Sequence, residues 1–409
     1  MENNKTPSIR FKGFTDPWEQ RKLGDMGSTF TGLSGKTKED FGHGDAQFIT
    51  YMNVFSNPVA NLEMTEAVEI DAKQNRVKKG DVFFTTSSET PEEVGMSCVM
   101  PENKDNIYLN SFCFGYRPTE KFDLDYLAYV LRADSFRKDM TFLAQGISRY
   151  NISKNKVMEV SIPIPNLEEQ NMVGRYFSNL DHLITLHQRK YDKLLNVKKS
   201  MLEKMFPKNE SNIPEIRFKG FTDPWEQRKV SEIGNIITGS TPKTSISDNY
   251  GGGFLFVSPA DIKGNRYVDE TITTLTKKGF DQGRKIREKA SLFVSIGSTI
   301  GKVAQTSQES TTNQQINAVE PYDNFDDDFI FSSLENISGS IKAIASNQAV
   351  PIVNKTTFGE TEIKVPSELL EQQKIGAYFR NLDNLVTLHQ RELEKLQNIK
   401  KSMLEKMFV

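Results

Sequence analysis

The sequence predicts a mixed α/β (α+β) protein built as a tandem repeat, in which two α/β bodies are each followed by a long helix. The segment IRFKGFTDPWEQRK occurs twice without change, at residues 9–22 and 216–229. A second segment, 176–206, returns at 378–408 with matched ends and matched apolar positions. Each repeated start leads into a variable body of roughly 150 residues that carries the signals of short strands. The order of start, body and helix therefore occurs twice along the chain.

The two long helices are predicted from apolar residues that alternate at spacings of three and four, which indicates one helical seam. The seam positions are Leu180, Leu183, His187 and Leu194 in the first copy, and Leu382, Leu385, His389 and Leu396 in the second. At a rise of 1.5 Å per residue, each helix spans roughly 45 to 60 Å, which suits a spacer. Two helices with the same seam in one chain are expected to pair.

The two bodies differ in sequence but share a pattern of short strands broken by turn signals. In the first body we expect strands at 47–51, 82–86, 96–100, 112–116 and 160–164, and one helix over 125–143. In the second we expect strands at 254–257, 291–295, 318–320 and 361–365, and a helix over 327–346. The predicted divisions are a first body at 1–166, a first long helix at 167–207, a second body at 208–366 and a second long helix at 367–409.

Composition narrows the class of protein. A chain of 409 residues predicts more than one domain, and 37% hydrophobic with 26% charged residues is typical of a globular protein. The formal net charge of −2 provides no global basic field for a nucleic-acid partner, although local patches decide contact. Cys98 and Cys113 are the only cysteines and lack metal-ligand spacing, so we expect reduced thiols in a cytoplasmic protein without signal peptide or membrane span.

Two motifs invite a catalytic interpretation. Asp16-Pro17-Trp18, repeated at 223–225, partly matches the Asp/Asn-Pro-Pro-aromatic motif of amino-methyltransferases, but it lacks the second proline and a preceding glycine-rich unit. An exposed turn whose tryptophan anchors the body to a helix fits better. The segment 297–302 has the wrong spacing for a phosphate-binding loop. Its residues Ser298, Thr299 and Lys302 either contact phosphate or base edges or form a solvent-facing hairpin.

Clusters of small polar and amide side chains are the candidate DNA-binding residues. Glutamine and asparagine can make paired hydrogen bonds to adenine, and arginine to guanine, in the major groove. For any single residue of these clusters a packing or turn role stays open. The clusters are Thr86, Ser87 and Ser88; Gln145, Ser148, Arg149 and Tyr150; Asn313, Gln314 and Gln315; and Asn347 with Gln348.

The helices also contain polar residues with more than one possible role. His187 and His389 fall at equivalent seam positions, where a polar residue fixes register; a metal pair lacks a further ligand on the same helix face. The runs at 198–199 and 400–401 are lysines that either touch phosphates or form a solvated flank. No catalytic set and no metal cluster stands out in the sequence, so no catalytic and no metal-binding residue is assigned.

The whole pattern resembles the specificity subunit of type I restriction-modification systems. The resemblance rests on the paired starts at 18–23 and 225–230 and on Leu167-Glu-Glu-Gln170 and Leu370-Glu-Gln-Gln373, each of which follows a proline-rich strand and opens a long helix. It covers essentially the entire chain. It implies that the bodies are target recognition domains, each reading one half of a split DNA sequence, and that the helices pair antiparallel as a spacer with a pseudo-twofold repeat.

The resemblance also implies partners and a division of labour. The chain itself is expected to be non-catalytic and to hold no cofactor. Modification (methyltransferase) subunits, two of them, are expected to bind S-adenosylmethionine and methylate adenine, and ATP-dependent restriction subunits to translocate and cleave. Because the two bodies differ, the double-stranded DNA target is expected to be bipartite and asymmetric, with an unread gap.

Two other functions remain as alternatives. A two-lobed adaptor would bind proteins in place of DNA, and a self-sufficient DNA methyltransferase would bind S-adenosylmethionine itself. The cofactor motifs missing from the sequence argue against the methyltransferase. The near-neutral charge leads us to expect that DNA-backbone contacts depend on the modification subunits.

Overall fold

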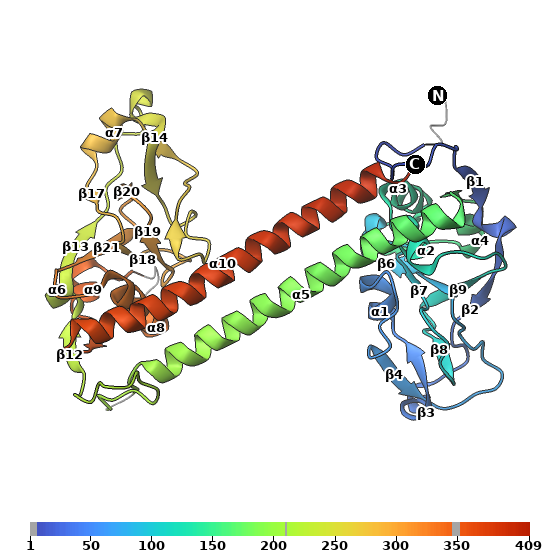
Figure 1. Ribbon diagram of the computed structural model, residues 1–409, viewed down its shortest axis with the longest axis horizontal. Coiled ribbons are helices and arrows are strands. Elements are labelled where there is room, and N and C mark those ends of the chain that lie inside the picture. Colours follow the sequence, from blue (N-terminus) through green and yellow to red (C-terminus); the bar gives the residue numbers. More distant parts are fainter. Residues whose placement is uncertain (1–5, 209–210, 346–351) are drawn as a thin grey trace. The chain divides into compact units, whose positions relative to one another are not determined.

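The computed structural model describes residues 6–208, 211–345 and 352–409, and it separates into two compact units. Unit 1 takes the chain up to Leu186 together with Leu393–Val409, and unit 2 is His187–Glu392. The division passes through both long helices, α5 (Leu167–Met205) and α10 (Leu369–Lys406). Each unit therefore holds one α/β domain and one part of each long helix (Figure 1).

The domain of unit 1 is built from short strands and short helices. Its strands are β1 (Glu19–Lys22), β2 (Gly27–Thr31), β3 (Phe41–Ile49), β4 (Thr65–Val68), β5 (Val82–Thr85), β6 (Ser87–Ser88), β7 (Ser97–Val99), β8 (Ile107–Leu109), β9 (Cys113–Pro118), β10 (Tyr150–Asn151) and β11 (Ser161–Ile164). Its helices are α1 (Tyr51–Ser56), α2 (Leu124–Val130), α3 (Asp134–Leu143) and α4 (Lys154–Met158).

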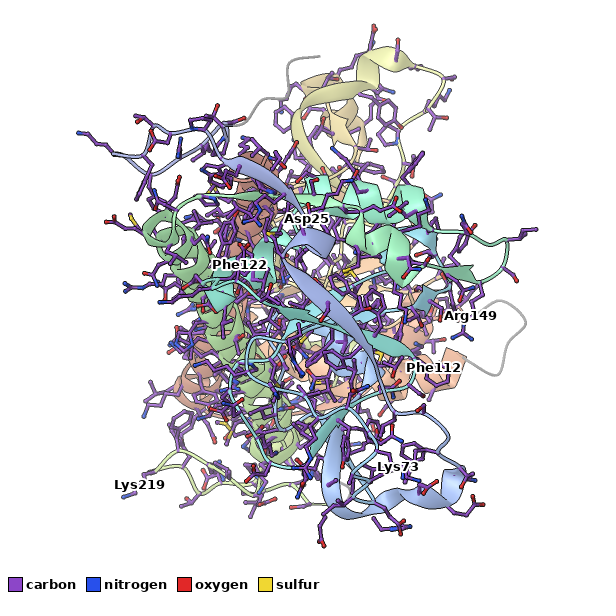
Figure 2. The ribbon with its side chains drawn as sticks, turned by 90° about the vertical axis from the view of Figure 1, so that its right-hand side faces the viewer. Asp25, Lys73, Phe112, Phe122, Arg149 and Lys219 are labelled. Atoms are coloured by element: carbon purple, nitrogen blue, oxygen red, sulfur yellow. The ribbon has the colours of Figure 1, made fainter. Side chains whose placement is uncertain are left out.

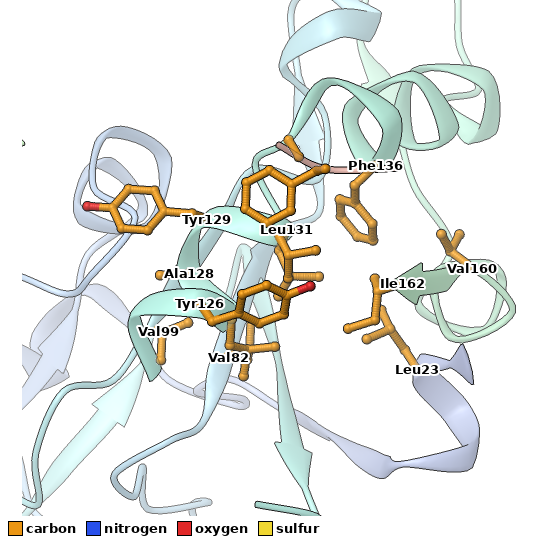
Figure 3. Close-up of a cluster of buried hydrophobic side chains, with 14 of the residues drawn as sticks. Leu23, Val82, Val99, Tyr126, Ala128, Tyr129, Leu131, Phe136, Val160 and Ile162 are labelled. Atoms are coloured by element: carbon orange, nitrogen blue, oxygen red, sulfur yellow. The ribbon is translucent and has the colours of Figure 1, made fainter. Parts of the chain in front are cut away.

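These strands form two principal sheets in unit 1. One is antiparallel in the order β2-β9-β5-β7, and the other has the order β4-β3-β8, with β3 parallel to β8. Every residue of β5 is buried, which explains why its sequence, Val-Phe-Phe-Thr, reads as a continuous apolar run and not as an alternating one. Figure 3 shows the core where this sheet meets α2, α3 and β11, with Val82, Tyr126, Phe136 and Ile162 among its side chains.

The domain of unit 2 has the same kinds of element. Its strands are β12 (Glu226–Lys229), β13 (Gly234–Thr238), β14 (Tyr250–Val257), β15 (Tyr267–Val268), β16 (Thr274–Leu275), β17 (Lys285–Ile286), β18 (Ser291–Val294), β19 (Val303–Thr306), β20 (Ser310–Thr312), β21 (Ile316–Pro321) and β22 (Glu362–Val365). Its helices are α6 (Val230–Ile233), α7 (Lys277–Gln282), α8 (Asp327–Ala345) and α9 (Lys355–Gly359).

The sheets of unit 2 repeat those of unit 1. The order β13-β21-β18-β19-β15 matches β2-β9-β5-β7 with one strand added at the edge. The order β16-β14-β20-β17 matches β4-β3-β8 in the same way, and β14 is parallel to β20 as β3 is to β8. The internal repeat seen in the sequence therefore extends to the bodies, although their sequences differ.

One predicted element is wrong. The apolar pattern over 125–143 predicts a single helix, but the chain forms α2 and α3 with a break between them, where Ala133 has extended backbone angles. The guanidinium of Arg132 sits at this break and donates hydrogen bonds to four backbone carbonyl oxygens at 2.8–3.0 Å. Long-range hydrogen bonds of this kind leave no trace in local periodicity.

The repeated start segment anchors the domain of unit 1 to both long helices. Trp18 is 1% exposed; its ring contacts that of Phe408, just beyond the end of α10, at a centroid distance of 6.4 Å. Its indole nitrogen donates to Glu169 of α5 at 3.1 Å. Arg10 completes the arrangement with two hydrogen bonds to the same carboxylate, at 2.6 and 2.8 Å. The sequence-based prediction that the tryptophan anchors the body to a helix is confirmed.

Unit 2 repeats the anchor with equivalent residues. The ring of Trp225 contacts Phe206, just after the end of α5, at 5.8 Å, and Arg217 donates two hydrogen bonds to Glu371 of α10 at 2.7 and 2.8 Å. The backbone N–H of Ile216 donates to the carbonyl of Lys204, as that of Ile9 does to Lys406 in unit 1. The start segment therefore has the same structural role in both halves.

The long helices pack antiparallel within each unit. In unit 2, His187 contacts His389 and Lys198 contacts Asp383. Later residues of α5 therefore contact earlier residues of α10, as antiparallel helices require. In unit 1, Asp181 of α5 likewise forms an ion pair with Lys400 of α10 at 2.5 Å. The antiparallel pairing implied by the family resemblance is confirmed.

The anchor predicts a unit-specific loss of stability. Phe408→Ala should lower the free energy of unfolding of unit 1 by about 3–5 kcal/mol, because it removes a buried ring from the contact with Trp18. The chain has two tryptophans, so a Trp225→Phe background leaves Trp18 as the reporter in urea titrations followed by fluorescence. The matched control is Phe206→Ala in that background, which should leave the Trp18 transition in place. Equal shifts in both variants would contradict the assignment.

Candidate nucleic-acid interface

A closed loop between α3 and α4 holds one predicted cluster of unit 1. Gln145 and Asn151 exchange two backbone hydrogen bonds of 2.9 Å and so close the loop at its base. Gly146 has φ +149°, and a Cβ added there would lie 2.1 Å from the carbonyl oxygen of Arg149. Only glycine fits this position without displacing the backbone. At the loop tip, Ile147 is 95% exposed, and Ser148 and Arg149 are exposed beside it.

The second predicted cluster of unit 1 lies directly against this loop. β6 pairs with β10, and Arg149 donates to the hydroxyl oxygen of Ser87 at 3.2 Å. The backbone carbonyl of Ser87 accepts from the hydroxyl of Tyr51 at 2.7 Å, and Ser88 donates to Glu93 at 3.0 Å. The structure therefore brings the Thr86–Ser88 and Gln145–Tyr150 clusters together. It also shows that Ser87 and Ser88 are buried and already hydrogen-bonded.

An open groove of about 640 Å³ runs along these residues. Its lining combines acidic, polar and apolar side chains, namely Tyr51, Met52, Phe55, Ser87, Ser88, Glu89, Glu93, Ser148 and Arg149. Burial raises the pKa of the Tyr51 hydroxyl above its ordinary value, so this group remains a protonated hydrogen-bond donor at neutral pH.

Phe112 is a surface residue of unit 1 that the sequence analysis assigned to a strand and not to the site. Its backbone N–H donates to the side chain of Asn110 at 2.8 Å, and its carbonyl oxygen accepts from the Thr86 hydroxyl at 2.8 Å. This asparagine turn leaves the Phe112 ring 58% exposed. Figure 2 shows Phe112 and Arg149 at the same edge of the molecule.

The corresponding turn in unit 2 contains the predicted cluster at 313–315. The backbone N–H of Gln315 donates to the Asn313 side chain at 3.0 Å, as Phe112 does to Asn110. The carbonyl of Gln315 accepts from the N–H of Ser295, just as the carbonyl of Phe112 accepts from the N–H of Thr86. Asn110-Ser-Phe and Asn313-Gln-Gln are thus the same turn in the two units.

Two further polar residues of unit 2 adjoin this turn, and the sequence analysis missed both. Thr241 donates to the Gln314 side-chain oxygen at 2.5 Å. Arg284 is exposed; its guanidinium donates to the carbonyl of Thr238 and its backbone N–H donates to Ser240. A threonine and an arginine in unrelated segments give no local signal of a shared surface, because only the tertiary fold brings Thr241 to Gln314 and Arg284 to Thr238 and Ser240.

The remaining predicted residues of unit 2 lie at a separate turn or outside the described part. The turn at 297–302 joins β18 to its antiparallel neighbour β19 and is therefore a hairpin turn, with Gly297 and Gly301 in the left-handed region. Ser298 is exposed and Thr299 half-buried, and the ammonium of Lys302 donates to the carbonyl of Ile262 at 3.0 Å.

Asn347 and Gln348 lie outside the described residues. Among the described residues, the bridge between Ile296 and Ile352 in unit 2 resembles the Ser87–Asn151 pair of unit 1.

The seam residues divide into buried and exposed positions. Leu180 and Leu382 are buried, and Leu194 and Leu396 pack against the cores of units 2 and 1. Leu183 and Leu385, in contrast, are 42% and 44% exposed, so these two equivalent positions do not lie in the buried face of their helices.

The two seam histidines contact each other in unit 2. Nδ1 of His187 and Nδ1 of His389 are 3.1 Å apart, which requires one ring to accept and the other to donate. In the part of the chain that the structure describes, no three His, Cys, Asp or Glu side chains gather as a metal site requires. The geometry fits a register-fixing hydrogen bond within the helix pair.

The lysine runs on the long helices are partly engaged in ion pairs. Lys198 contacts Asp383 and Glu335 at 2.6 Å, and the equivalent Lys400 contacts Asp181 at 2.5 Å. These lysines therefore join the helices to each other and to the domains. Lys199 and Lys401 are exposed. None of the helices in the described residues has the length and apolarity of a bilayer-spanning segment.

Comparison with known proteins identifies a family. Residues 15–196 and 222–398, one stretch in each half, match the family described as type I restriction modification DNA specificity domain. The putative type I restriction enzyme MjaX specificity subunit of Methanocaldococcus jannaschii is 24% identical over 409 residues, covering 95% of this chain and 92% of the relative. The HindI specificity subunit of Haemophilus influenzae is 31% identical over 170 residues, covering 40% of this chain and 37% of the relative.

Two solved structures share the fold. A type I restriction-modification S subunit from M. genitalium has a TM-score of 0.72 at 16% identity and covers 99% of both chains. A chain from a study of complex assembly and conformational transition of the type I R-M system has a TM-score of 0.52 at 18% identity, covering 96% of this chain and 98% of that chain.

The histidine contact predicts a pH-dependent stability of unit 2. Burial, followed by the positive potential of His187 and Lys190, lowers the pKa of His389. The unfolded chain therefore binds this proton more tightly than the folded chain does. The contribution of neutral His389 to the stability of unit 2 is complete above pH ~6.5 and is lost as the pH falls toward the lowered pKa. His389→Asn should reduce the fall in melting temperature between pH 7.5 and 5 measured by circular dichroism. His182→Asn, an exposed neighbour, is the control; equal pH dependence in all three proteins would contradict the prediction.

Proposed function

This chain belongs to the type I restriction-modification DNA specificity family, and on that premise we propose how it recognises DNA. It serves in sequence-specific DNA recognition and is the non-catalytic specificity subunit of its system. The proposal is that each unit reads one half of a bipartite, asymmetric site in double-stranded DNA. Partner subunits then methylate adenine in that site or cleave the DNA.

The observation that carries this proposal is a common backbone frame that holds different side chains. Asn110 and Asn313 make the same turn in units 1 and 2, and the same backbone hydrogen bonds tie that turn to the neighbouring strand. The two residues after the asparagine are serine and phenylalanine in one unit but two glutamines in the other. Two domains that recognise two different half-sites require a common backbone that carries different exposed side chains.

The side chains of unit 2 suit direct reading of base edges. Gln314 is exposed, and the hydrogen bond from Thr241 orients its side-chain oxygen while leaving its amide group to donate. A glutamine can bond adenine through N6 and N7 at once. Arg284 adjoins the same turn and carries a guanidinium, which suits guanine O6 and N7. We assign these residues to the half-site read by unit 2.

The partners follow from the family and from the charge of the chain. Two modification subunits that bind S-adenosylmethionine, together with ATP-dependent restriction subunits, would supply the chemistry, and this chain would hold no cofactor. A formal net charge of −2 provides few spare cations for phosphates, so the modification subunits would supply much of the backbone contact.

The assignment of Gln314 predicts a change in one half of the target. Gln314→Ala should weaken discrimination at one base pair of the unit 2 half-site by roughly 5- to 150-fold, the range of one paired hydrogen-bond contact. Sequencing of methylated adenines in cells that express the chain with its modification subunits measures this directly. The matched control is Ser111→Ala, at the equivalent position of unit 1. If Gln314→Ala relaxed both halves, or neither, separate reading by the two units would be wrong.

The charge balance predicts that the isolated chain binds DNA weakly. In gel-shift titrations at 150 mM salt, the chain alone should show little preference for its target, and addition of the modification subunits should increase both affinity and salt dependence. The reason is that each added phosphate contact steepens the slope of the log binding constant against log salt concentration by about one. Tight, specific binding by the chain alone would contradict this prediction.

A further inference from the structure

Unit 1 exposes large apolar side chains at its closed loop, at its asparagine turn and along the groove. Ile147, at the tip of the closed loop, is 95% exposed, and Phe112, in the asparagine turn, is 58% exposed. Met52, which lines the groove with Ser148 and Arg149, is 53% exposed. Large apolar side chains gathered at a surface indicate an interaction site, whereas single ones do not.

These apolar residues are connected through one hydrogen-bonded frame. Arg149, two residues after Ile147, donates to Ser87, and Thr86 in the preceding position donates to the carbonyl of Phe112. The loop tip and the turn therefore flank the same short strand, and Figure 2 shows Phe112 and Arg149 on one edge.

The frame also restricts what the polar residues of unit 1 can do. The guanidinium of Arg149 donates a hydrogen bond of 3.2 Å to the hydroxyl oxygen of Ser87, and the Ser88 hydroxyl donates to the carboxylate of Glu93. Glu89 and Glu93 make the groove acidic. Carboxylates oppose phosphate binding. Ile147 and Phe112 are exposed and have no polar side-chain group, so these hydrogen bonds do not restrict them.

DNA offers an apolar partner for such residues in the major groove. The C5-methyl group of thymine is the apolar feature of the base-pair edges there, and in unmodified DNA it distinguishes T·A pairs from the others. Isoleucine and phenylalanine can contact this methyl group but cannot donate a hydrogen bond to a base.

We propose that unit 1 recognises its half-site through the 5-methyl groups of thymines, with Ile147 and Phe112 as the specificity-determining residues. This rests on the proposed function, in which this edge of unit 1 faces the major groove. The loop geometry supports it, because the Gln145–Asn151 pair closes the base of the loop and Ile147 is exposed at its tip. Unit 2, with Gln314 in the equivalent turn, reads its half-site by hydrogen bonds.

The test replaces thymine by deoxyuridine, which removes the methyl group and keeps base pairing. Duplexes are prepared that contain the sequence methylated by the complex. At each T of the unit 1 half-site they carry either thymine or uracil. Binding to the purified complex of this chain with its modification subunits is measured by competition. Each contacted methyl should contribute a roughly fourfold change in affinity, the usual effect of burying one carbon group.

Variants then assign the effect to the two side chains. Ile147→Ala or Phe112→Ala should weaken binding to the thymine duplex and reduce its advantage over the uracil duplex. Ile147 is almost fully exposed, so this substitution leaves folding intact. Ile272→Ala, which removes an isoleucine of unit 2 that is 75% exposed, is the matched control and should keep the full thymine preference in the unit 1 half-site.

The outcomes separate this proposal from the proposed function. A complex that binds its target specifically but equally well with thymine and uracil overturns the thymine proposal and leaves DNA recognition standing. A unit 1 half-site without a T·A pair, or a thymine preference unchanged in both alanine variants, also overturns it. A complex that shows no sequence preference in any duplex overturns the proposed function itself.

Discussion

The rest of the structure depends on a buried ionic and aromatic anchor that occurs once in each unit. In unit 1 the carboxylate of Glu169 is fully buried and receives hydrogen bonds from Arg10 and Trp18. A buried carboxylate is tolerated only when it is paired and hydrogen-bonded, and removing one partner of such a pair costs about 3–5 kcal/mol. Because Glu169 belongs to the first turn of α5 and Phe408 follows α10, this one cluster joins the start segment to both helices.

The anchors differ between the units in one respect. The indole nitrogen of Trp18 donates to Glu169, whereas that of Trp225 is buried without a hydrogen-bond partner in the described structure. Unit 2 instead has a second ionic cluster, in which Arg266 is 4% exposed and bonds Asp328, Asp383 and Gln305. The corresponding aspartate of unit 1, Asp181, accepts from the hydroxyl of Tyr129. Equivalent helix positions are therefore joined to their domains by different chemistry.

At the candidate interface, too, the two units share backbone contacts and differ in their side chains. A Cβ at Gly32 would lie 2.1 Å from the carbonyl oxygen of Asn110, and one at Gly239 would lie 2.1 Å from that of Asn313. The close approach of a glycine thus fixes the asparagine turn in both units. Of the positions that follow the asparagine, Ser111, Phe112 and Gln314 are exposed, whereas Gln315 is half-buried and accepts a hydrogen bond from the Asn313 side chain.

The sequence by itself determined the repeat, the bounds of the long helices to within about three residues, and the anchoring role of the tryptophans. These depend on identical segments and on local periodicity, which a single chain displays directly. It also selected the Gln145–Tyr150 and Asn313–Gln315 clusters as candidate DNA-binding residues, and that role stays a prediction. Only the tertiary structure decided that Phe112 and Arg284 belong beside them, that the helix over 125–143 breaks at Arg132, and that Leu183 and Leu385 are exposed. The reason is that these outcomes depend on hydrogen bonds and packing between residues distant in sequence, which leave no periodic or local signal.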